Sequence, residues 1–518
     1  MPIDLKKALG ATALATAILA GSGSAMAADL RVNIAADPSM IDPITYSELI
    51  AGQVISNMYE SFTAIDADGQ VIPALAESWE PLEGNLGFRF KLREGVKFHS
   101  GREFTAEDVK FSFEELLRPG NKAGLNAPYL DVVVGADAMK DGSADTLSGV
   151  TVVDDYTVEV AFTRPDVLFP IYPIYLFDSG IVEEAGPEWY NKVSAGTGAF
   201  KFENWGRGQK VELAAHADYW GGAPAIDGVE FVVIPSPETA MAMFETGDLD
   251  VMVVDGPSMR RVLGNPELKE RAITAARAQV RYLAMNSDLY EPFKDKRVRE
   301  AVCRSLDQDA MIAGLYSGAA KPLYGQVTEG VAGYNPDLPK IEYDPEKAKA
   351  LLAEAGYPNG EGLPPVKLST TEPNKNQHLY FASQLQEVLN MPVDVELVER
   401  GTHLKSINSG QTPFFAWGWS AGYPDGLYFL SQLWYSDSPY NRGWKNAEFD
   451  ALIDKASMTA DNKERYAIYH EAEGMLIDDW GTCPLPVSTL MATVRDGVSG
   501  VAIQPFGLVP FADVTIAE

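Results

Sequence analysis

The sequence is poor in the side chains that build most catalytic and metal centres. It contains only 2 cysteines and 5 histidines in 518 residues. No histidine pair has the H-E-x-x-H spacing of a zinc protease, and no cluster of histidines and cysteines has the spacing of a metal site. We therefore expect neither a bound metal nor a cofactor. His403, alone on a predicted helix after Arg400-Gly401-Thr402, is expected to be a solvated surface residue.

The two cysteines leave two alternatives open. Cys303 and Cys483 could form a disulfide in an oxidising compartment, or both could be buried as small apolar side chains. Cys303 lies within the helical pattern RVREAVCRSL, where a buried thiol is sufficient. The second alternative is therefore favoured.

Positive charge is also scarce. Lys and Arg number 42 against 73 Asp and Glu, which gives a net charge of −31. Such a balance argues against nucleic acid and against an anionic membrane surface as partners. The length of 518 residues exceeds the size at which one hydrophobic core keeps growing, so two or three lobes are expected.

Long apolar runs are missing everywhere except at the N-terminus. Lys6 and Lys7 precede an apolar run over residues 8–20, and Ala25-Met26-Ala27 follows as an A-x-A cleavage site. No later stretch reaches the roughly 18 apolar residues of a membrane span. We expect a signal peptide of residues 1–27, cleaved near Ala27, and a soluble product exported to the periplasm.

Strand and helix patterns alternate through most of the remaining chain, which predicts mixed α/β layers. Helix-capping patterns support several of the helices, among them Thr105 to Asp108, Ser236-Pro237 and Asp344-Pro345. Strands are expected at 30–34, 87–92, 157–162, 250–254, 282–286, 366–370, 393–398 and 414–419. Helices are expected at 47–59, 105–117, 236–245, 298–306, 307–315, 344–355, 378–389, 449–456 and 465–479.

Aromatic side chains concentrate in one stretch, residues 414–444. It holds four of the nine tryptophans, and aromatic residues occupy 11 of its 31 positions against 10% of the whole chain. Glycines, prolines and polar residues interrupt the rings, as in a small-molecule pocket with apolar area and a few directed polar contacts. The alternative is a core strand followed by a loop that its own rings pack. The candidate ligand-binding residues are Trp417, Trp419, Tyr423, Asp425, Tyr428, Trp434, Asn441 and Arg442, with Tyr46 from the N-terminal region as a further candidate.

A series of motifs runs in order along the chain. The N-terminal third carries PALAESWE at 73–80, FRFKLREGVKFHSG at 88–101 and TAEDVKFSFE at 105–114. GTGAFKFENW at 196–205, FETGDLD at 244–250, DKRVREAV at 295–302, YDPEKAKALLAEAGYP at 343–358 and NAEFDALIDKA at 446–456 follow. Together these motifs resemble the peptide/nickel class of extracytoplasmic solute-binding proteins, family 5.

The resemblance implies a periplasmic-binding-protein type II fold, an α/β architecture with mixed sheets and two lobes joined by a hinge. It places lobe I at residues 28–68, 185–285 and 490–518, an inserted subdomain at 69–184 and lobe II at 286–489. It also implies a monomeric, non-enzymatic protein that delivers a peptide or peptide-like solute to the permease of an ABC importer. The aromatic stretch would then lie on lobe II and face the cleft.

One position departs from the family pattern. Many peptide binders of this family carry an Asp three residues after the tryptophan that corresponds to Trp419, and this carboxylate pairs with the α-ammonium of the ligand. Here the position is Gly422, and the next acid is Asp425, which either replaces the missing carboxylate or only caps a turn. An oligosaccharide, an opine or another conjugate is therefore an alternative ligand.

A third alternative is an exported hydrolase. Gly418 to Gly422 reads GWSAG and satisfies the G-x-S-x-G pattern of a nucleophile elbow around Ser420. However, Pro424 follows where the helix of such an elbow should run, and His470 is the only histidine downstream. We do not expect catalysis.

Overall fold

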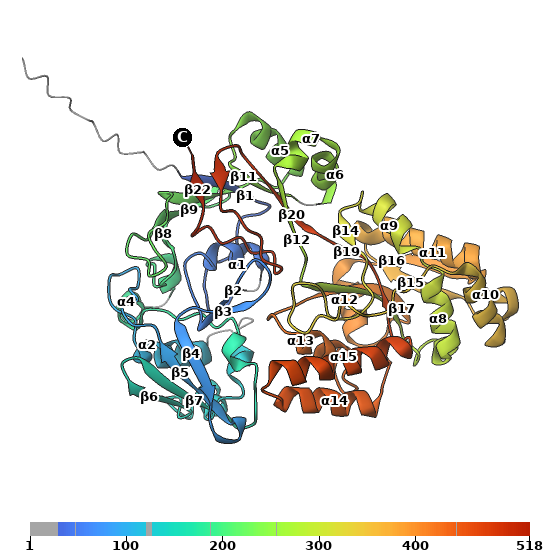
Figure 1. Cartoon of the computed structure of the whole chain (residues 1–518), viewed down its shortest axis with the longest axis horizontal. Helices are drawn as coiled ribbons and strands as arrows, with labels where there is room; N and C mark the ends of the chain where they lie inside the picture. Colours follow the sequence, from blue (N-terminus) through green and yellow to red (C-terminus); the bar gives the residue numbers. More distant parts are fainter. Residues whose placement is uncertain are drawn as a thin grey trace, which may run out of the picture.

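The structure is a computed structural model that describes residues 29–46, 48–120, 127–186, 188–254, 256–441 and 443–517. The predicted signal peptide and Arg442 fall outside these ranges. The chain forms two halves that stand side by side, one coloured blue to green and the other yellow to red (Figure 1). The C-terminal segment returns from the second half to the first. Within the described ranges, none of the helices has the length and apolar character needed to cross a membrane.

A mixed seven-stranded sheet organises the first half, lobe I. Strand β1 (Leu30–Ile34) is parallel to both of its neighbours, β10 (Gly228–Val233) and β11 (Val251–Val254), and all the other pairs are antiparallel. Lobe I packs apolar side chains against both faces of this sheet, since neighbouring Val251 and Met252 belong to separate cores. The strand order is β12 (Ala272–Ala275), β20 (Leu490–Val494), β11 (Val251–Val254), β1 (Leu30–Ile34), β10 (Gly228–Val233), β9 (Lys210–Ala215) and β8 (Phe200–Gly206).

A four-stranded antiparallel sheet lies within the predicted inserted subdomain. Its order is β4 (Ala76–Pro81), β5 (Gly87–Leu92), β7 (Thr157–Ala161) and β6 (Val150–Asp154). The subdomain does not have a core of its own: Phe90 stacks on Phe62 of lobe I with ring centroids 4.0 Å apart, and both belong to one continuous cluster. The subdomain is therefore fixed to lobe I.

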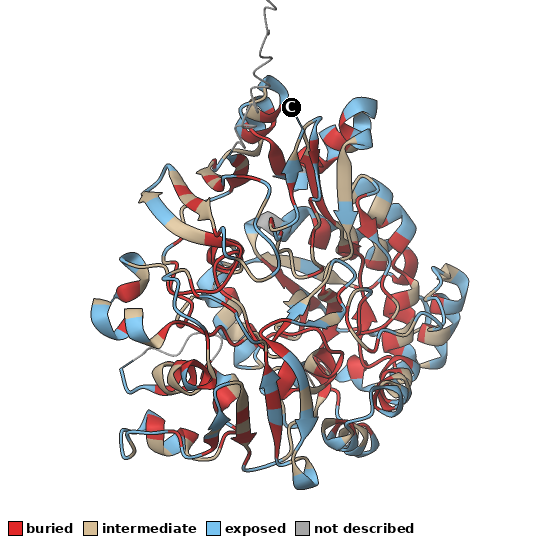
Figure 2. Ribbon diagram, turned by 60° about the vertical axis from the view of Figure 1, so that its left-hand side comes forward, coloured by how far each residue is buried: buried red, intermediate tan, exposed pale blue. Residues whose placement is uncertain are grey.

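The second half, lobe II, is built on a five-stranded sheet between two layers of helices. The strand order is β16 (Val393–Leu397), β15 (Val366–Thr370), β17 (Phe414–Ser420), β13 (Gln279–Met285) and β18 (Cys483–Pro484). Helices α8 (Lys296–Arg304), α10 (Pro345–Glu354) and α11 (Lys375–Leu389) cover one face. Helices α12 (Arg400–Asn408), α14 (Ala447–Met458) and α15 (Asn462–Asp478) cover the other. Buried residues follow the strands and the inner sides of these helices (Figure 2).

Two nearby segments connect the lobes. One runs from β12 of lobe I to β13 of lobe II, and the other from β19 (Val487–Ser488), which pairs with β14 (Ala320–Lys321), to β20. Because β13 pairs along its whole length with β17, we propose that the first crossing lies between Ala275 and Gln279 rather than near Asn286. We propose that the second crossing lies near Thr489, directly before β20 in the lobe I sheet.

Most predicted elements are present, with shifted ends. The remaining helices are α1 (Leu49–Ile55), α2 (Ala106–Leu117), α3 (Ala136–Lys140), α4 (Ser179–Ala185), α5 (Pro237–Thr246), α6 (Gly256–Gly264), α7 (Pro266–Glu270), α9 (Gln308–Leu315) and α13 (Leu427–Phe429). The remaining strands are β2 (Thr63–Ile65), β3 (Val71–Pro73), β21 (Val498–Ser499) and β22 (Thr515–Ile516). Helix α1 is shorter than predicted because the Asn57 and Met58 carbonyls accept hydrogen bonds from Phe200 and Gly198.

The two cysteines are buried free thiols, which is the favoured alternative. Cys303 on α8 and Cys483 on β18 each expose 2% of their surface and belong to the same core. Burial raises the pKa of the Cys303 thiol well above its usual value, and the neighbouring Cys483 adds to the effect. Both thiols therefore act as small apolar side chains in the lobe II core.

One carboxyl group is buried in lobe II without a cation. Glu473 of α15 is fully buried; its Oε1 accepts hydrogen bonds from the backbone N–H groups of Gln326 and Val327. Its Oε2 has no hydrogen-bond partner among the described residues. Burial raises the pKa of Glu473 to about 7 from an ordinary 4.5. The folded protein therefore binds a proton on Glu473 more tightly than the unfolded chain does.

We expect Glu473 to make stability fall as pH rises from 4.5 to 7, since over this interval the folded protein holds a proton that the unfolded chain releases. Above pH 7 the ionised form costs about 3 kcal/mol. Glu473→Gln should remove this cost and gain stability over wild type at pH 8 but not at pH 4.5. Urea unfolding at both pH values measures the difference. An equal gain in stability at both pH values would contradict the raised pKa of Glu473. The same gain from Glu471→Gln, on the exposed side of α15, would also contradict it.

Candidate functional site

The aromatic stretch begins as strand β17 and opens to solvent along its length. Phe414, Phe415 and Ala416 are buried, Trp417 to Trp419 are half-buried, and Ser420 is exposed. A loop over 421–426 follows, then α13 and a π-helical turn over Leu430–Trp434. The strand therefore anchors the stretch in the lobe II core, and its carboxyl end presents side chains at the surface.

Three of the predicted rings lie at this open end. Trp419 packs against Tyr440 with ring centroids 4.6 Å apart, and the Trp417 ring lies 6.4 Å from that of His403. Tyr428 is half-buried beside them. Burial raises the pKa of Tyr428, so its phenol is neutral and available for hydrogen bonding. These residues form the accessible part of the aromatic stretch.

Tyr423 joins the aromatic stretch to the inserted subdomain. It is buried, and its ring centroid lies 5.0 Å from Tyr172 and 6.2 Å from Tyr129, which stack on each other at 4.6 Å. Leu168 of the subdomain belongs to the same apolar cluster as the lobe II core. Tyr423 therefore lies at a contact between the two halves. It is far in sequence from both segments that connect the lobes.

Asp425 occupies a closed interior site. Its carboxylate forms an ion pair with Arg465 at 3.1 Å, accepts a hydrogen bond from the Tyr469 hydroxyl at 2.5 Å and accepts another from the Leu427 N–H at 2.9 Å. The side chains of Asp425 and Arg465 expose 1% and 5% of their surface. Burial raises the pKa of Asp425, and the Arg465 guanidinium opposes that rise. This placement favours the turn-capping alternative over a replacement for the missing family carboxylate.

The other predicted residues have mainly structural contacts. Trp434 is buried and packs edge to face with Tyr282 at 5.1 Å. The Asn441 amide donates to the carbonyls of Trp434 and Tyr435 and so closes the loop after the π-helical turn. Tyr46 of lobe I is half-buried near Tyr175, 6.0 Å between ring centroids.

Gly422 is packed too closely for a side chain. A Cβ atom there would lie 2.9 Å from the Tyr129 hydroxyl and 3.1 Å from the Tyr428 ring. Both neighbours are phenols, and one comes from each half of the molecule. A carboxylate at position 422 would therefore have to displace two tyrosine side chains.

Sequence reasoning missed a polar pocket beside Trp417. The pocket has a volume of about 240 Å³ and lies at the carboxyl ends of β15 and β17, where Arg281 of β13 and Arg400 of α12 also meet. Its lining includes Thr370, Asn374, His378 and His403. No short motif connects these residues. The usual position of ligand sites at the carboxyl ends of parallel strands would have indicated the region.

The prediction for His403 is wrong. The side chain exposes only 6% of its surface, and its Nδ1 lies 2.9 Å from the Ser369 hydroxyl. Burial lowers the pKa of His403, so the ring is neutral near pH 7. Helix α12 turns this residue toward the sheet instead of toward solvent.

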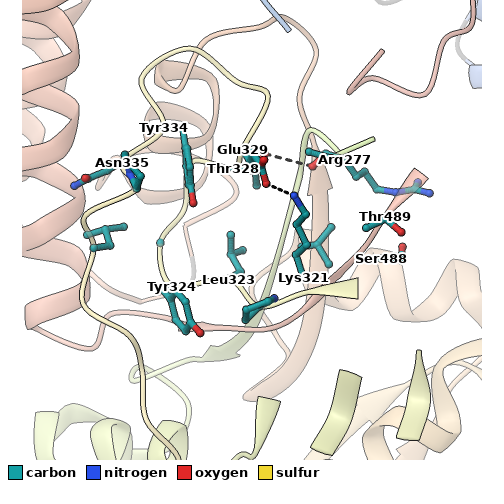
Figure 3. Close-up of a pocket in the computed structure, with 16 residues that line it drawn as sticks. Arg277, Lys321, Leu323, Tyr324, Thr328, Glu329, Tyr334, Asn335, Ser488 and Thr489 are labelled. Atoms are coloured by element: carbon teal, nitrogen blue, oxygen red, sulfur yellow. Dashed lines mark hydrogen bonds and ion pairs between the residues drawn. The ribbon is translucent and has the colours of Figure 1, made fainter. Parts of the chain in front are cut away.

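A second cavity of about 240 Å³ lies at the crossings between the lobes (Figure 3). Arg277 and Thr489 from the two crossings line it together with Tyr324 and Tyr334 of lobe II. Lys321 forms an ion pair with Glu329 within it. The cavity is therefore lined by both connections between the lobes.

Ser420 lacks the partners of a catalytic nucleophile. Its hydroxyl accepts a hydrogen bond from the Gln279 amide at 3.2 Å. No histidine is bonded to Ser420 in the described part of the chain, and a loop, not a helix, follows it. A nucleophile requires an adjacent base, so this geometry does not support the hydrolase alternative.

Replacing Asp425 should test its structural role. We expect Asp425→Ala to lower the free energy of unfolding by about 3–5 kcal/mol, because the buried Arg465 charge would remain unpaired. The matched control is Asp437→Ala, an exposed carboxylate of the same stretch, with a change below about 0.5 kcal/mol. Urea unfolding of the ligand-free protein measures both. If Asp425→Ala is as stable as the control but loses solute binding, Asp425 contacts the solute instead.

Comparison with known proteins gives consistent matches over most of the chain. The family model described as bacterial extracellular solute-binding proteins, family 5 Middle, matches residues 70–441. Heme-binding protein A of Haemophilus influenzae is 31% identical over 473 residues, which cover 86% of this chain and 84% of that protein. The dipeptide-binding protein of Escherichia coli is 30% identical over 472 residues, 86% of each chain.

Solved structures match the whole fold. The murein tripeptide-binding protein MppA in its unliganded open form has a TM-score of 0.83 at 25% identity, covering 95% of this chain and 98% of that one. DppA of Helicobacter pylori in complex with the peptide STSA has a TM-score of 0.71 at 25% identity, covering 94% and 98%. The bilobal architecture, the family model and the curated relatives agree, and the chain belongs to the bacterial extracellular solute-binding proteins of family 5.

Proposed function

We propose that this protein is the solute-binding component of an ABC importer, which captures a peptide or peptide-like solute between its lobes and delivers it to the membrane permease. The observation that carries the proposal is the open end of β17, where Trp417, Trp419 and Tyr428 are half-buried on the lobe II side. Such rings supply the apolar area of a small-molecule site. The names of several relatives, which include dipeptide and di/tripeptide-binding proteins, support a peptide.

Closure of the two lobes on the solute provides the mechanism. Two short connections join lobes that have separate sheets, so the lobes can rotate with little change inside either core. A solute that contacts both lobes stabilises the closed state by the contacts that only this state provides.

The proposed protein acts without catalysis, as a monomer in the periplasm after signal peptide cleavage near Ala27. A binding protein needs no activated nucleophile, and Ser420 has none of the partners of one. The net charge of −31 argues against nucleic acid as a further partner. The candidate binding residues remain Trp417, Trp419, Tyr423 and Tyr428, with Tyr46 from lobe I.

A non-peptide conjugate, such as an oligosaccharide or an opine, is the second candidate solute. The crowding at Gly422 and the closed ion pair of Asp425 favour it, because neither position offers a carboxylate to an α-ammonium. An ammonium group transferred into a buried site without a counter-charge would be strongly disfavoured.

Native mass spectrometry of protein purified without unfolding should identify the solute class. A protein with retained solute is expected to show a mass excess equal to one small molecule, which is lost on unfolding. Calorimetric titration with di- and tripeptides, and separately with oligosaccharides, gives the second reading. Binding of sugars with no heat from any peptide would overturn the peptide proposal and leave the transport role in place.

The half-buried rings of Trp417, Trp419 and Tyr428 lead to a separate prediction. Trp419→Ala should weaken solute binding about 5–30-fold, since the loss of half-buried indole area on the solute costs about 1–2 kcal/mol. Tyr343→Ala, at an exposed aromatic elsewhere on lobe II, serves as the control and should leave affinity unchanged. Titration calorimetry with the solute identified above measures both. Unchanged affinity in Trp419→Ala would show that this ring packs only against the protein.

A further inference from the structure

The inserted subdomain touches lobe II along an apolar seam that lies outside the two connections between the lobes. Leu168 of the subdomain is buried in the lobe II cluster that contains Leu427 and Phe429. Four half-buried side chains of the subdomain pack against the same cluster: Tyr129, Val167, Ile171 and Tyr172. In Figure 1 the subdomain, with β4 to β7, lies beside α13 and α14. Lobe I is therefore held to lobe II by this seam as well as by the chain crossings.

Tyrosine rings from both halves meet at the seam. The Tyr129 and Tyr172 rings of the subdomain stack with their centroids 4.6 Å apart. The Tyr423 ring of lobe II lies 5.0 Å from Tyr172 and meets Tyr129 edge to face at 6.2 Å. Tyr428, a candidate solute contact, packs edge to face against Tyr423 at 4.9 Å. Stacked and edge-to-face rings attract each other beyond the area that they bury, so this series of rings links the subdomain to the accessible part of the aromatic stretch.

The subdomain side of this contact is held in place by its own hydrogen bonds. The Tyr172 hydroxyl donates to both carboxylate oxygens of Asp166, at 3.1 and 3.0 Å. Asp166 also accepts a hydrogen bond from the Leu168 N–H at 3.1 Å. Burial raises the pKa of Tyr172 well above its usual value, so the phenol keeps the proton that it donates. The ring that meets Tyr423 is therefore positioned before any contact with lobe II is made.

The contacts across the seam can separate without breaking either core. Hydrogen bonds that cross the seam include those from the Tyr129 hydroxyl to the Gly422 carbonyl and from the Asn85 amide to the Met458 carbonyl. Both are 3.5 Å long, which is beyond the usual length of a strong hydrogen bond. A cavity of about 240 Å³, lined by Asp166 and other residues of the subdomain and by side chains of lobe II, interrupts the packing. A contact with long hydrogen bonds and incomplete packing permits relative motion of the parts that it joins.

We infer that Tyr129, Tyr172 and Tyr423 act as a latch that forms when the lobes close and that slows the release of the bound solute. The latch consists of protein side chains alone, so it stabilises the closed state to the same extent for every solute. It therefore adds to the retention of the solute without adding selectivity. The inference rests on the proposed solute-binding function and goes beyond it, because it assigns the inserted subdomain a role in retention.

Small-angle X-ray scattering of solute-free protein tests the latch without any ligand. Tyr172→Ala and Tyr423→Ala should both give a larger radius of gyration than wild type, because the closed arrangement loses contacts that only it provides. The matched control is Tyr156→Ala, since this tyrosine of the same subdomain donates to Glu103 and is not among the residues of the seam. Its radius of gyration should equal that of wild type. Melting temperatures confirm that each variant is folded.

The release rate of the tripeptide Ala-Phe-Ala, followed by stopped-flow Trp fluorescence, gives a second measurement. Tyr172→Ala and Tyr423→Ala should each release the peptide about 5-fold faster than wild type. The double variant should release it at most about 2-fold faster than either single variant, because both substitutions remove the same contact. Tyr129→Phe keeps the stacked ring and loses only the 3.5 Å hydrogen bond, so it should change the release rate less than Tyr129→Ala does.

The outcomes distinguish the latch from the proposed function. Equal radii of gyration in wild type, Tyr172→Ala and Tyr423→Ala would overturn the latch and leave peptide binding intact. Additive effects of these two substitutions on the release rate would also overturn it, since the two rings would then act separately. If Ala-Phe-Ala does not bind, the scattering measurement alone decides. Larger radii in the two seam variants, but not in Tyr156→Ala, would support the latch while the peptide proposal fails, and equal radii would overturn both.

Discussion

The buried pair of Asp425 and Arg465 fixes the geometry on which the rest of the proposed site depends. Asp425 holds the start of α13, Arg465 and Tyr469 belong to α15, and a backbone bridge from Asp425 to Ala332 ties the same turn to the loop beside the lobe crossings. Every strong donor around the carboxylate is satisfied, so the pair keeps one arrangement. The rings on either side of the turn are held by this contact together with their own packing, as in the Tyr423–Tyr172 and Trp419–Tyr440 pairs.

The architecture could be predicted from the sequence much better than the candidate site could. Strands such as β5 and β15 and helices such as α5 and α10 were predictable because periodicity and capping residues are local properties. The end of α1 was not, because the carbonyls of Asn57 and Met58, just after the helix, accept hydrogen bonds from Phe200 and Gly198, which are about 140 residues away. In the aromatic stretch, composition identified the right segment but could not separate half-buried Trp419 from buried Trp434. The two arginines of the pocket, Arg281 of β13 and Arg400 of α12, are far apart in sequence, and only tertiary structure brings them together.

The net charge of the molecule and the charge of the pocket beside Trp417 have opposite signs. The acidic surface excludes whole classes of macromolecular partner, whereas a pocket of about 240 Å³ has the opposite sign. Electrostatic interactions within a partly desolvated pocket are screened less than those across the exposed surface. Charged groups that line the pocket therefore interact more strongly with a nearby charge than charged groups on the exposed surface do.

The two crossings between the lobes are adjacent in space, so lobe II resembles a domain inserted into lobe I. Lobe II is one continuous segment that leaves lobe I after β12 and returns at β20, and residues of both crossings line the same cavity. Its two ends are therefore neighbours in space, as in a domain inserted into a surface loop. Lobe II is therefore arranged as an inserted domain. It could be exchanged with lobe II of a relative, or expressed as an independent chain, without cutting any strand of the seven-stranded sheet.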